Sequence, residues 1–342
     1  MSHNNTPLHN DALSILTEQQ LLHVNGLIQR LGDPTKHVYP VDVYTTRPHG
    51  SRQIKRDPGW EDTVAEDLEE ITEPYIATDE NGRPLVIYMP DYLSEKAVKE
   101  VTVGLKKLHD HLGVKAPKAD TRHTGLDLAE LEETYGPHGY GTLHCAAWFE
   151  TGHVEEGPMI SSEMCTGSKR LNATCRFVQA TRTVKEELSL LYAAGDPSSW
   201  RRCVDSFKKL QQYVPATVIL RTSTIDPWSS IALNSNLPAR IHRDLNDAER
   251  ELSGLSCFGS FYLGFLALPS LGIKLRFKVR DACIVNTFFL PHYVVKWTVS
   301  THLVSRFSMS FFNHQDVLDW VRTRYKAKHK KVKSCERMEM QG

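Results

Sequence analysis

Two side chains in one short, strand-like run could bind a metal ion together. The run PARIHRD contains His242, Arg243 and Asp244. Because side chains alternate across an extended strand, His242 and Asp244 would project from one face and Arg243 from the other. An imidazole and a carboxylate on one face suit a metal ion. Taken alone, however, a His-X-Asp pair is more often a hydrogen-bonded pair than a pair of ligands.

A third ligand is available downstream. A facial triad of two histidines and one carboxylate leaves open positions on Fe(II) for O2 and an oxo-acid cosubstrate. The third residue of such a triad should come from another strand. His292 lies in the segment NTFFLPHYVVKW, 48 residues after Asp244 (292 − 244). We therefore expect His242, Asp244 and His292 to form one metal site.

A basic residue with suitable neighbours follows His292 by 14 residues (306 − 292). In the run RFSMSFF, Arg306 and Ser308 would share one face of a strand. A planar guanidinium binds a carboxylate through two parallel hydrogen bonds, and a hydroxyl two residues along reaches the same group. This pair suits the distal carboxylate of 2-oxoglutarate.

The surrounding sequence predicts helices first and strands afterwards. Apolar residues at helical spacing predict an amphipathic helix over 92–112 and further helices over 184–194 and 200–213. After Pro215 the sequence changes to short β-rich runs separated by Gly and Pro: ATVILRT, PARIHRD, CFGSFYLGFLALP, IKLRFKV, ACIVNTFFL and SRFSMSFF. This order favours an α+β domain that ends in an antiparallel sandwich or barrel.

Taken together, these motifs resemble the 2-oxoglutarate/Fe(II)-dependent dioxygenases, and within them the TET/JBP group, especially its fungal members. The resemblance rests on His-Arg-Asp at 242–244, a glycine-containing hairpin at 258–272, Leu-Pro-His at 290–292, and Arg-X-Ser followed by aromatic residues at 306–312. It is best from 227 to about 325. It implies a double-stranded β-helix, a jelly-roll relative, as the core of the fold, with supporting helices.

Carried over by position, the resemblance makes His242, Asp244 and His292 the iron ligands. It assigns the binding of 2-oxoglutarate to Arg306, assisted by Ser308. The cofactor would be Fe(II), and the cosubstrates would be O2 and 2-oxoglutarate, which is decarboxylated to succinate.

One rival ligand and two departures accompany this assignment. His302 competes with His292 as the third ligand, but it lies only four residues before Arg306 on the same strand or its entry, so His292 is preferred. The family has glycine at the positions of Leu263, in the hairpin, and Arg280, in a turn before an aspartate. Neither change touches an expected ligand.

The implied activity is stepwise oxidation of the methyl group of a methylated base in DNA, most often 5-methylcytosine. A base inside a duplex cannot reach a buried iron, so it would have to be flipped out of the stack. From the segment LHCAAWFETG we take His144 and Trp148 as candidate pocket residues, although each one taken singly is more often a core residue. Lys169, Arg170 and the basic C-terminal tail are candidates for phosphate contacts.

Other functions stay open. The same iron chemistry could demethylate N6-methyladenine in DNA, with loss of formaldehyde, or hydroxylate a protein or a small molecule. A non-enzymatic binding module on a degenerate dioxygenase fold is disfavoured, because the complete ligand set and Arg306 are retained.

The charges are balanced overall but unevenly placed. The chain has 342 residues with 41 Lys+Arg and 41 Asp+Glu, which argues against a globally basic DNA-binding protein. Residues 1–80 carry 6 basic and 14 acidic side chains, whereas residues 322–342 carry eight basic and two acidic ones. We expect the acidic stretch 57–80 to be solvated and the basic run to act as a nuclear-localisation or polyanion-binding segment; without that signal the protein would be cytoplasmic.

These patterns predict three regions: an N-terminal extension over 1–120 with the acidic stretch and the amphipathic helix, a dioxygenase domain over 121–325, and a basic tail over 326–342. Seven cysteines without any Cys-X-X-Cys pair indicate neither a disulfide framework nor a zinc site. The sequence has no apparent signal peptide and no membrane span, so we expect an intracellular protein without a membrane partner. No protein partner can be inferred.

Overall fold

The computed structural model describes residues 11–40, 65–112, 127–135, 139–151, 154–295, 297–299 and 306–324. The α-helices are α2 (Glu18–Leu31), α4 (Glu95–Leu112), α5 (Leu128–Tyr135), α6 (Ser162–Cys165), α7 (Ser168–Ala180), α8 (Arg182–Gly195) and α9 (Pro197–Tyr213). The short 3-10 helices are η1 (Pro34–Lys36), η3 (Val154–Glu156), η4 (Pro215–Leu220) and η5 (Pro269–Leu271). Residues 315–324 are also helical.

The strands are β1 (Val38–Tyr39), β2 (Glu69–Ile71), β3 (Tyr75–Asp79), β4 (Pro84–Met89), β5 (Gly141–Trp148), β6 (Met159–Ile160), β7 (Ser230–Ser235), β8 (Ser253–Gly259), β9 (Phe261–Leu263), β10 (Phe265–Leu268), β11 (Ile273–Arg276), β12 (Ala282–Val285), β13 (Tyr293–Val294), β14 (Trp297–Val299) and β15 (Arg306–Phe312). Among the described residues, no helix is long and apolar enough to cross a membrane.

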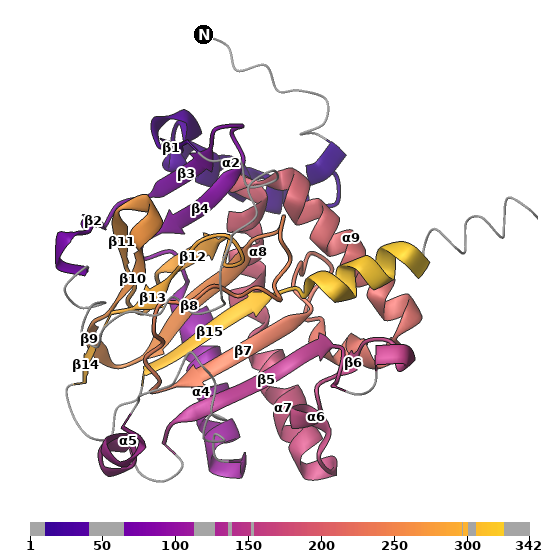
Figure 1. Cartoon of the computed structure of the whole chain (residues 1–342). Coiled ribbons are helices and arrows are strands. Elements are labelled where there is room, and N and C mark those ends of the chain that lie inside the picture. Colours follow the sequence, from indigo (N-terminus) through magenta and orange to yellow (C-terminus); the bar gives the residue numbers. More distant parts are fainter. Residues whose placement is uncertain are drawn as a thin grey trace, which may run out of the picture.

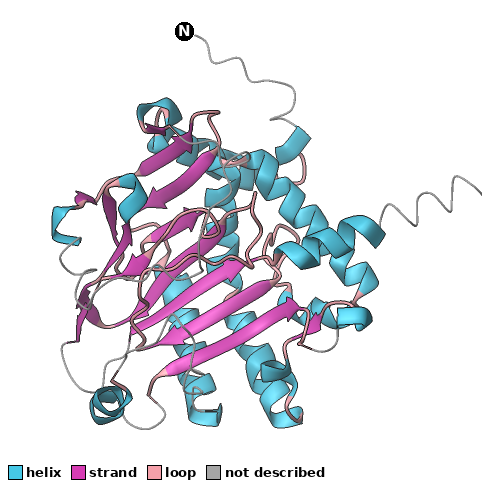
Figure 2. Ribbon diagram, viewed as in Figure 1, coloured by secondary structure: helices cyan, strands magenta, loops and turns pink. Residues whose placement is uncertain are grey.

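A nine-stranded sheet forms the middle of the molecule, with helices on one side of it (Figures 1 and 2). Its strand order is β1-β3-β4-β12-β8-β15-β7-β5-β6. Alternate side chains of the central strands, such as Leu143, Leu233 and Phe311, belong to one apolar core with buried residues of α4, α7, α8 and α9. The helices therefore cover that face of the sheet and leave its other face for a second layer.

That second layer is a four-stranded sheet of order β13-β10-β11-β2. Its buried residues Leu266, Ile273 and Leu275 share a second apolar core with Val86 on β4 and Leu255 on β8, both from the large sheet. The fold is α+β, as expected, and the two facing sheets are compatible with a jelly-roll core.

The expected helices are present, but two of the expected strands, 216–222 and 238–244, are wrong: 238–244 forms only an isolated bridge at His242. Residues 216–222, ATVILRT, were expected to be extended, and the structure has the 3-10 helix η4 there. Pro215 opens this helix at its first turn, and the Thr217 hydroxyl donates to the Val214 carbonyl at 2.7 Å. Local turn bonding thus outweighs the strand preference of the β-branched residues.

The acidic stretch 57–80 is only partly described, and its last part is not solvated. Tyr75–Asp79 forms β3, which is buried at every position. The Asp79 carboxylate accepts hydrogen bonds from the backbone N–H groups of Asn81 and Arg83, at 2.9 and 2.8 Å. Satisfying the carboxylate locally lets an acidic residue end a core strand. Strands β3 and β4 lie in the large sheet although they belong to the expected extension 1–120.

Two of the four described non-glycine residues with positive φ matter for the comparison with the resembled family. Leu263 has φ +59° and Arg280 has φ +76°. These are the two positions at which the sequence departs from the resembled family by replacing glycine. The turns keep a left-handed shape, and the chain accepts the strain of a side chain there.

Candidate metal centre and substrate cavity

Two loops bring the three expected metal ligands together. His242 and Asp244 lie between β7 and β8, and His292 lies between β12 and β13. His242 and His292 exchange backbone hydrogen bonds of 3.0 and 2.9 Å, and the Asp244 N–H donates to the Thr287 carbonyl at 3.0 Å. These bonds fix both loops, although the run 238–244 forms only this isolated bridge and no regular strand.

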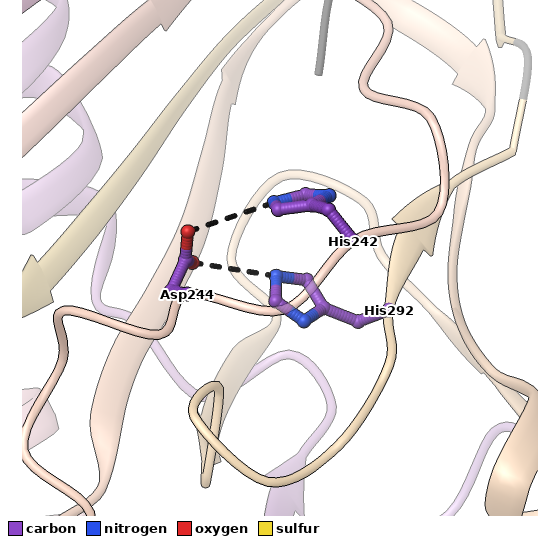
Figure 3. A group of neighbouring side chains, drawn as sticks. All are labelled: His242, Asp244 and His292. Carbon is purple, nitrogen blue, oxygen red and sulfur yellow. Dashed lines mark ion pairs between the residues drawn. The ribbon is translucent and has the colours of Figure 1, made fainter. Parts of the chain in front are cut away.

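The side chains of the three residues converge on one point (Figure 3). One ligand atom from each of His242, Asp244 and His292 lies within 4.8 Å of the others, a spacing that could hold a metal ion. The Asp244 carboxylate oxygens lie 3.8 Å from His242 Nε2 and 3.6 Å from His292 Nε2. His242 and His292 are buried, while Asp244 is half-buried.

The hydrogen-bond partner of Nδ1 fixes the tautomer of each of these two histidines. His242 Nδ1 lies 2.7 Å from the Arg240 carbonyl oxygen, and His292 Nδ1 lies 3.0 Å from the Leu290 carbonyl oxygen. Because a carbonyl oxygen only accepts, each Nδ1 carries the hydrogen and each neutral ring keeps its Nε2 lone pair. The backbone thus presents both Nε2 atoms as ligands.

The three residues open onto a cavity of about 450 Å³. This volume lies in the range of about 300–1,000 Å³ that is typical of small-molecule sites. The expected residues Ser308, His144 and Trp148 line the same cavity. Other lining residues that matter below are Glu163, Asp247, Phe277, Phe312, His314 and Asp316.

Arg306 does not itself line this cavity and is almost completely buried, at 1% exposure. Its guanidinium carbon lies 6.0 Å from the ring centroid of Phe277, which lines the cavity. Its Nη2 donates to Cys257 Sγ at 2.9 Å, and burial raises the pKa of that thiol to about 12, so the thiol is neutral. Burial also lowers the pKa of Arg306. Among the described residues, no carboxylate forms an ion pair with this cation, and its Nε has no hydrogen-bond partner.

His144 and Trp148 come from β5, at the other side of the cavity. Their rings are 5.2 Å apart and tilted. Glu163 accepts a hydrogen bond from the His144 backbone N–H at 2.8 Å and lies 3.3 Å from His144 Nδ1. The Trp148 indole N–H donates to Glu150 at 2.9 Å. Glu163 and Glu150 thus hold the two rings in place.

His314, which follows β15, also lines the cavity, and the sequence motifs did not predict it. Its ring packs edge-on against Trp148, at 5.9 Å, and against Phe312, at 5.2 Å. Its Nδ1 lies 3.2 Å from the Asn246 carbonyl oxygen, so Nδ1 carries the hydrogen, and its buried Nε2 has no partner among the described residues. Burial lowers the pKa of His314, which keeps the ring neutral. The sequence contains 16 histidines, and no motif distinguishes His314 from the others.

Other expected residues lie away from this arrangement or outside the described residues. Arg170 donates its Nε–H to the Glu163 carbonyl at 2.6 Å, and Lys169 is exposed on α7. His302 and the basic tail 326–342 lie outside the described residues.

Comparison with solved structures identifies the class of fold. The structure resembles that of NgTET1 in complex with 5mC DNA, with a TM-score of 0.53 and 13% sequence identity, over 89% of this chain and 92% of that chain. The chain therefore has a fold like that of this TET structure. No family model matches the sequence. No curated protein matches it either.

Proposed function

We propose that this protein is an Fe(II)- and 2-oxoglutarate-dependent dioxygenase that oxidises the methyl group of a methylated base in DNA. The favoured reaction converts 5-methylcytosine to 5-hydroxymethylcytosine and further oxidised forms. One observation carries the proposal: a single cavity joins a His-Asp-His group that could hold a metal ion to a wall of aromatic rings. The likeness of the fold to NgTET1 in complex with 5mC DNA supports it.

The residues present fit both the metal ion and the oxo-acid. His242, Asp244 and His292 offer two imidazole nitrogens and a carboxylate, the donor set of facial-triad Fe(II) sites. The buried cation of Arg306 suits the distal carboxylate of 2-oxoglutarate, and the Ser308 hydroxyl lines the cavity beside it. When bound, Fe(II) with O2 and the oxo-acid supplies the oxidising power for hydroxylating a C–H bond.

The remaining cavity suits a flipped, uncharged base. Trp148, Phe312 and His314 provide apolar ring surfaces on which a planar ring can stack. His314 Nε2 is a lone-pair acceptor, which matches the exocyclic amino group of cytosine. Among the described residues that line the cavity, four are Asp or Glu and none is Lys or Arg. We infer that the DNA phosphates stay outside while the base enters.

The test is an incubation of the protein with Fe(II), ascorbate, 2-oxoglutarate and duplexes that carry 5-methylcytosine or N6-methyladenine, followed by mass spectrometry of the nucleosides. We expect oxidised cytosine products from the wild-type protein and none from His242→Ala or Asp244→Ala. His111→Ala, an exposed change on α4, is the matched control and should keep full activity.

Two outcomes would redirect the proposal. Loss of the N6-methyl group with formaldehyde release would assign the alternative base, N6-methyladenine. No product from either duplex, with 2-oxoglutarate turnover restored by another substrate, would assign a protein or small-molecule hydroxylase. Unchanged oxidation of DNA by Asp244→Ala would refute the metal assignment.

The finer placement within the group rests on the sequence. The motifs at 242–244, 290–292 and 306–312 support the proposed resemblance to the fungal members of the TET/JBP group. The run of eight basic residues in 322–342 supports a nuclear location, where a DNA substrate would be met.

A further inference from the structure

Two buried hydrogen-bond donors without partners lie side by side behind Phe277, a residue that lines the cavity. One is Arg306 Nε and the other is Trp297 Nε1. The Arg306 guanidinium carbon lies 4.7 Å from the Trp297 ring centroid. Among the described residues, neither nitrogen has an acceptor within hydrogen-bonding distance.

The rings around Arg306 hold the guanidinium but cannot replace an anion. Its carbon lies 5.2 Å from the Phe261 ring and 6.0 Å from the Phe277 ring, in addition to Trp297. Such cation–π contacts attract and orient the cation. They accept nothing from N–H groups that lie in the plane of the guanidinium. The Cys257 thiol, the other contact, is neutral because burial raises its pKa to about 12.

Strand pairing places Trp297 beside Arg306. Strand β14 pairs with β9, so that Trp297 lies opposite Leu263. The next residue, Gly264, has φ +94°, and a side chain there would begin 3.4 Å from Trp297 Cβ. The positive φ at 264 favours glycine there, and the turn packs directly against Trp297. The Gly264 carbonyl also accepts a hydrogen bond from the Phe277 N–H at 3.1 Å, which ties this turn to the ring that lines the cavity.

A pair of orphan donors around a buried cation is costly unless a ligand satisfies it. A buried donor without a partner loses its hydrogen bonds to water and gains none in return. A carboxylate has two oxygens and about four lone-pair positions, so it can accept from a guanidinium and an indole N–H at once. A neutral ligand would leave the cation uncompensated.

We propose that Trp297 donates its indole N–H to the distal carboxylate of the oxo-acid cosubstrate, beside Arg306. This inference rests on the proposed function and adds a residue to it. Trp297 is then a cosubstrate-binding residue, and the dicarboxylic oxo-acid is held by two donors of different kinds.

The first test observes the indole directly. The protein contains six Trp residues, so the Zn(II)-loaded, ¹⁵N-labelled protein should give six indole N–H signals in an NMR spectrum. The signal that is missing from Trp297→Phe identifies Trp297. We expect this signal to move downfield when 2-oxoglutarate is added, as it does when an N–H begins to donate to a carboxylate. A signal that stays in place while 2-oxoglutarate binds would overturn the inference.

The second test measures affinity. In Trp297→Phe the ring that packs on Arg306 remains and only the N–H is lost. We expect the Kd for 2-oxoglutarate, measured by calorimetry on the Mn(II)-loaded protein without O2, to rise roughly tenfold or more. The Kd for Mn(II) should be unchanged. Trp320→Phe, a distant change in the helical stretch 315–324, is the matched control and should bind 2-oxoglutarate like the wild type.

The outcomes distinguish a failure of the role of Trp297 from a failure of the proposed function. If the wild-type protein does not bind 2-oxoglutarate in the presence of the metal, the proposed function fails. If the wild type binds it and Trp297→Phe binds it equally well, only the role of Trp297 fails. A variant with altered Mn(II) affinity would have lost its fold, and the NMR signal of the wild type then decides alone.

Discussion

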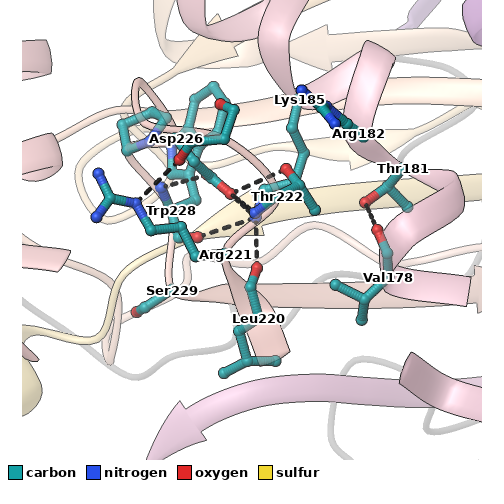
Figure 4. Close-up of polar contacts among 12 residues, drawn as sticks. Val178, Thr181, Arg182, Lys185, Leu220, Arg221, Thr222, Asp226, Trp228 and Ser229 are labelled. Carbon is teal, nitrogen blue, oxygen red and sulfur yellow. Dashed lines mark hydrogen bonds and ion pairs between the residues drawn. The ribbon is translucent and has the colours of Figure 1, made fainter. Parts of the chain in front are cut away.

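At the scale of single residues, the helical layer depends on a buried cation. Lys185 on α8 is fully buried and pairs with Asp226 (Figure 4). Its Nζ also donates to the carbonyls of Leu220 and Trp228, at 3.1 Å each. Burial lowers the pKa of Lys185, and Asp226 opposes that shift. The pair ties α8 to the segment that leads into β7.

We predict that Lys185→Met lowers the free energy of unfolding by about 3–5 kcal/mol, because it leaves the Asp226 carboxylate buried without its countercharge. The double variant Lys185→Met, Asp226→Asn should recover part of that loss, since no charge then remains and an amide oxygen can still accept from Thr222. Urea denaturation measures both values. Lys208→Met, an exposed change on α9, should stay within about 0.5 kcal/mol of the wild type. A double variant less stable than the single one would contradict this account.

The candidate metal ligands could be predicted at this scale, and the pocket residues only in part. The motif at His242 and Asp244 pointed to the ligands, although the run forms no regular strand and backbone bonds to His292 and Thr287 hold the two residues instead. His314 could not be found in this way, because its importance comes from the orphan Nε2 and from Trp148, 166 positions earlier (314 − 148). Such contacts depend on chain segments that meet only in the folded protein.

At the scale of elements, β15 follows the expected alternation. Ser308 and Ser310 line the cavity, while Met309 and Phe311 belong to the core under the helices. The run 216–222 did not follow its strand preference, because a proline and a threonine at its start favour a turn of helix. Strand preference is weak when local hydrogen bonds compete with it.

A second element-scale feature is the turn at Leu263, which is 65% exposed at φ +59°. We predict that Leu263→Gly raises the free energy of unfolding by about 1 kcal/mol, since it relieves left-handed strain and removes little buried surface. Arg280→Gly is the informative comparison. Its Nε donates to the Leu93 carbonyl at 2.8 Å, so relief of strain there should be offset by the lost hydrogen bond. Equal stabilisation by both changes in thermal or urea unfolding would contradict this reasoning.

At the scale of the whole molecule, the candidate metal site joins two parts of the chain that lie 48 residues apart (292 − 244). An ion that binds only the folded state stabilises it by about 2.7 kcal/mol when its free concentration is 100 times its Kd. For a chain of this size we predict a rise of a few degrees in Tm when Mn(II) is added to the metal-free protein. Chelation with EDTA should reverse the rise. His242→Ala should show no Mn(II)-dependent shift, and a shift as large as that of the wild type would place the ion elsewhere.

The sequence by itself indicated the three candidate donors, the helices that became α4, α8 and α9, and the face of β15 on which Ser308 and Ser310 lie. The helices and the face of β15 follow from periods of 3.6 and two residues along the chain, which local backbone geometry imposes. Only the tertiary structure decided that β3 and β4 complete the large sheet, that His314 lines the cavity and that Trp297 packs on Arg306. Those arrangements depend on contacts between segments that are far apart in the sequence. A local sequence pattern does not specify which distant segment a strand will pair with.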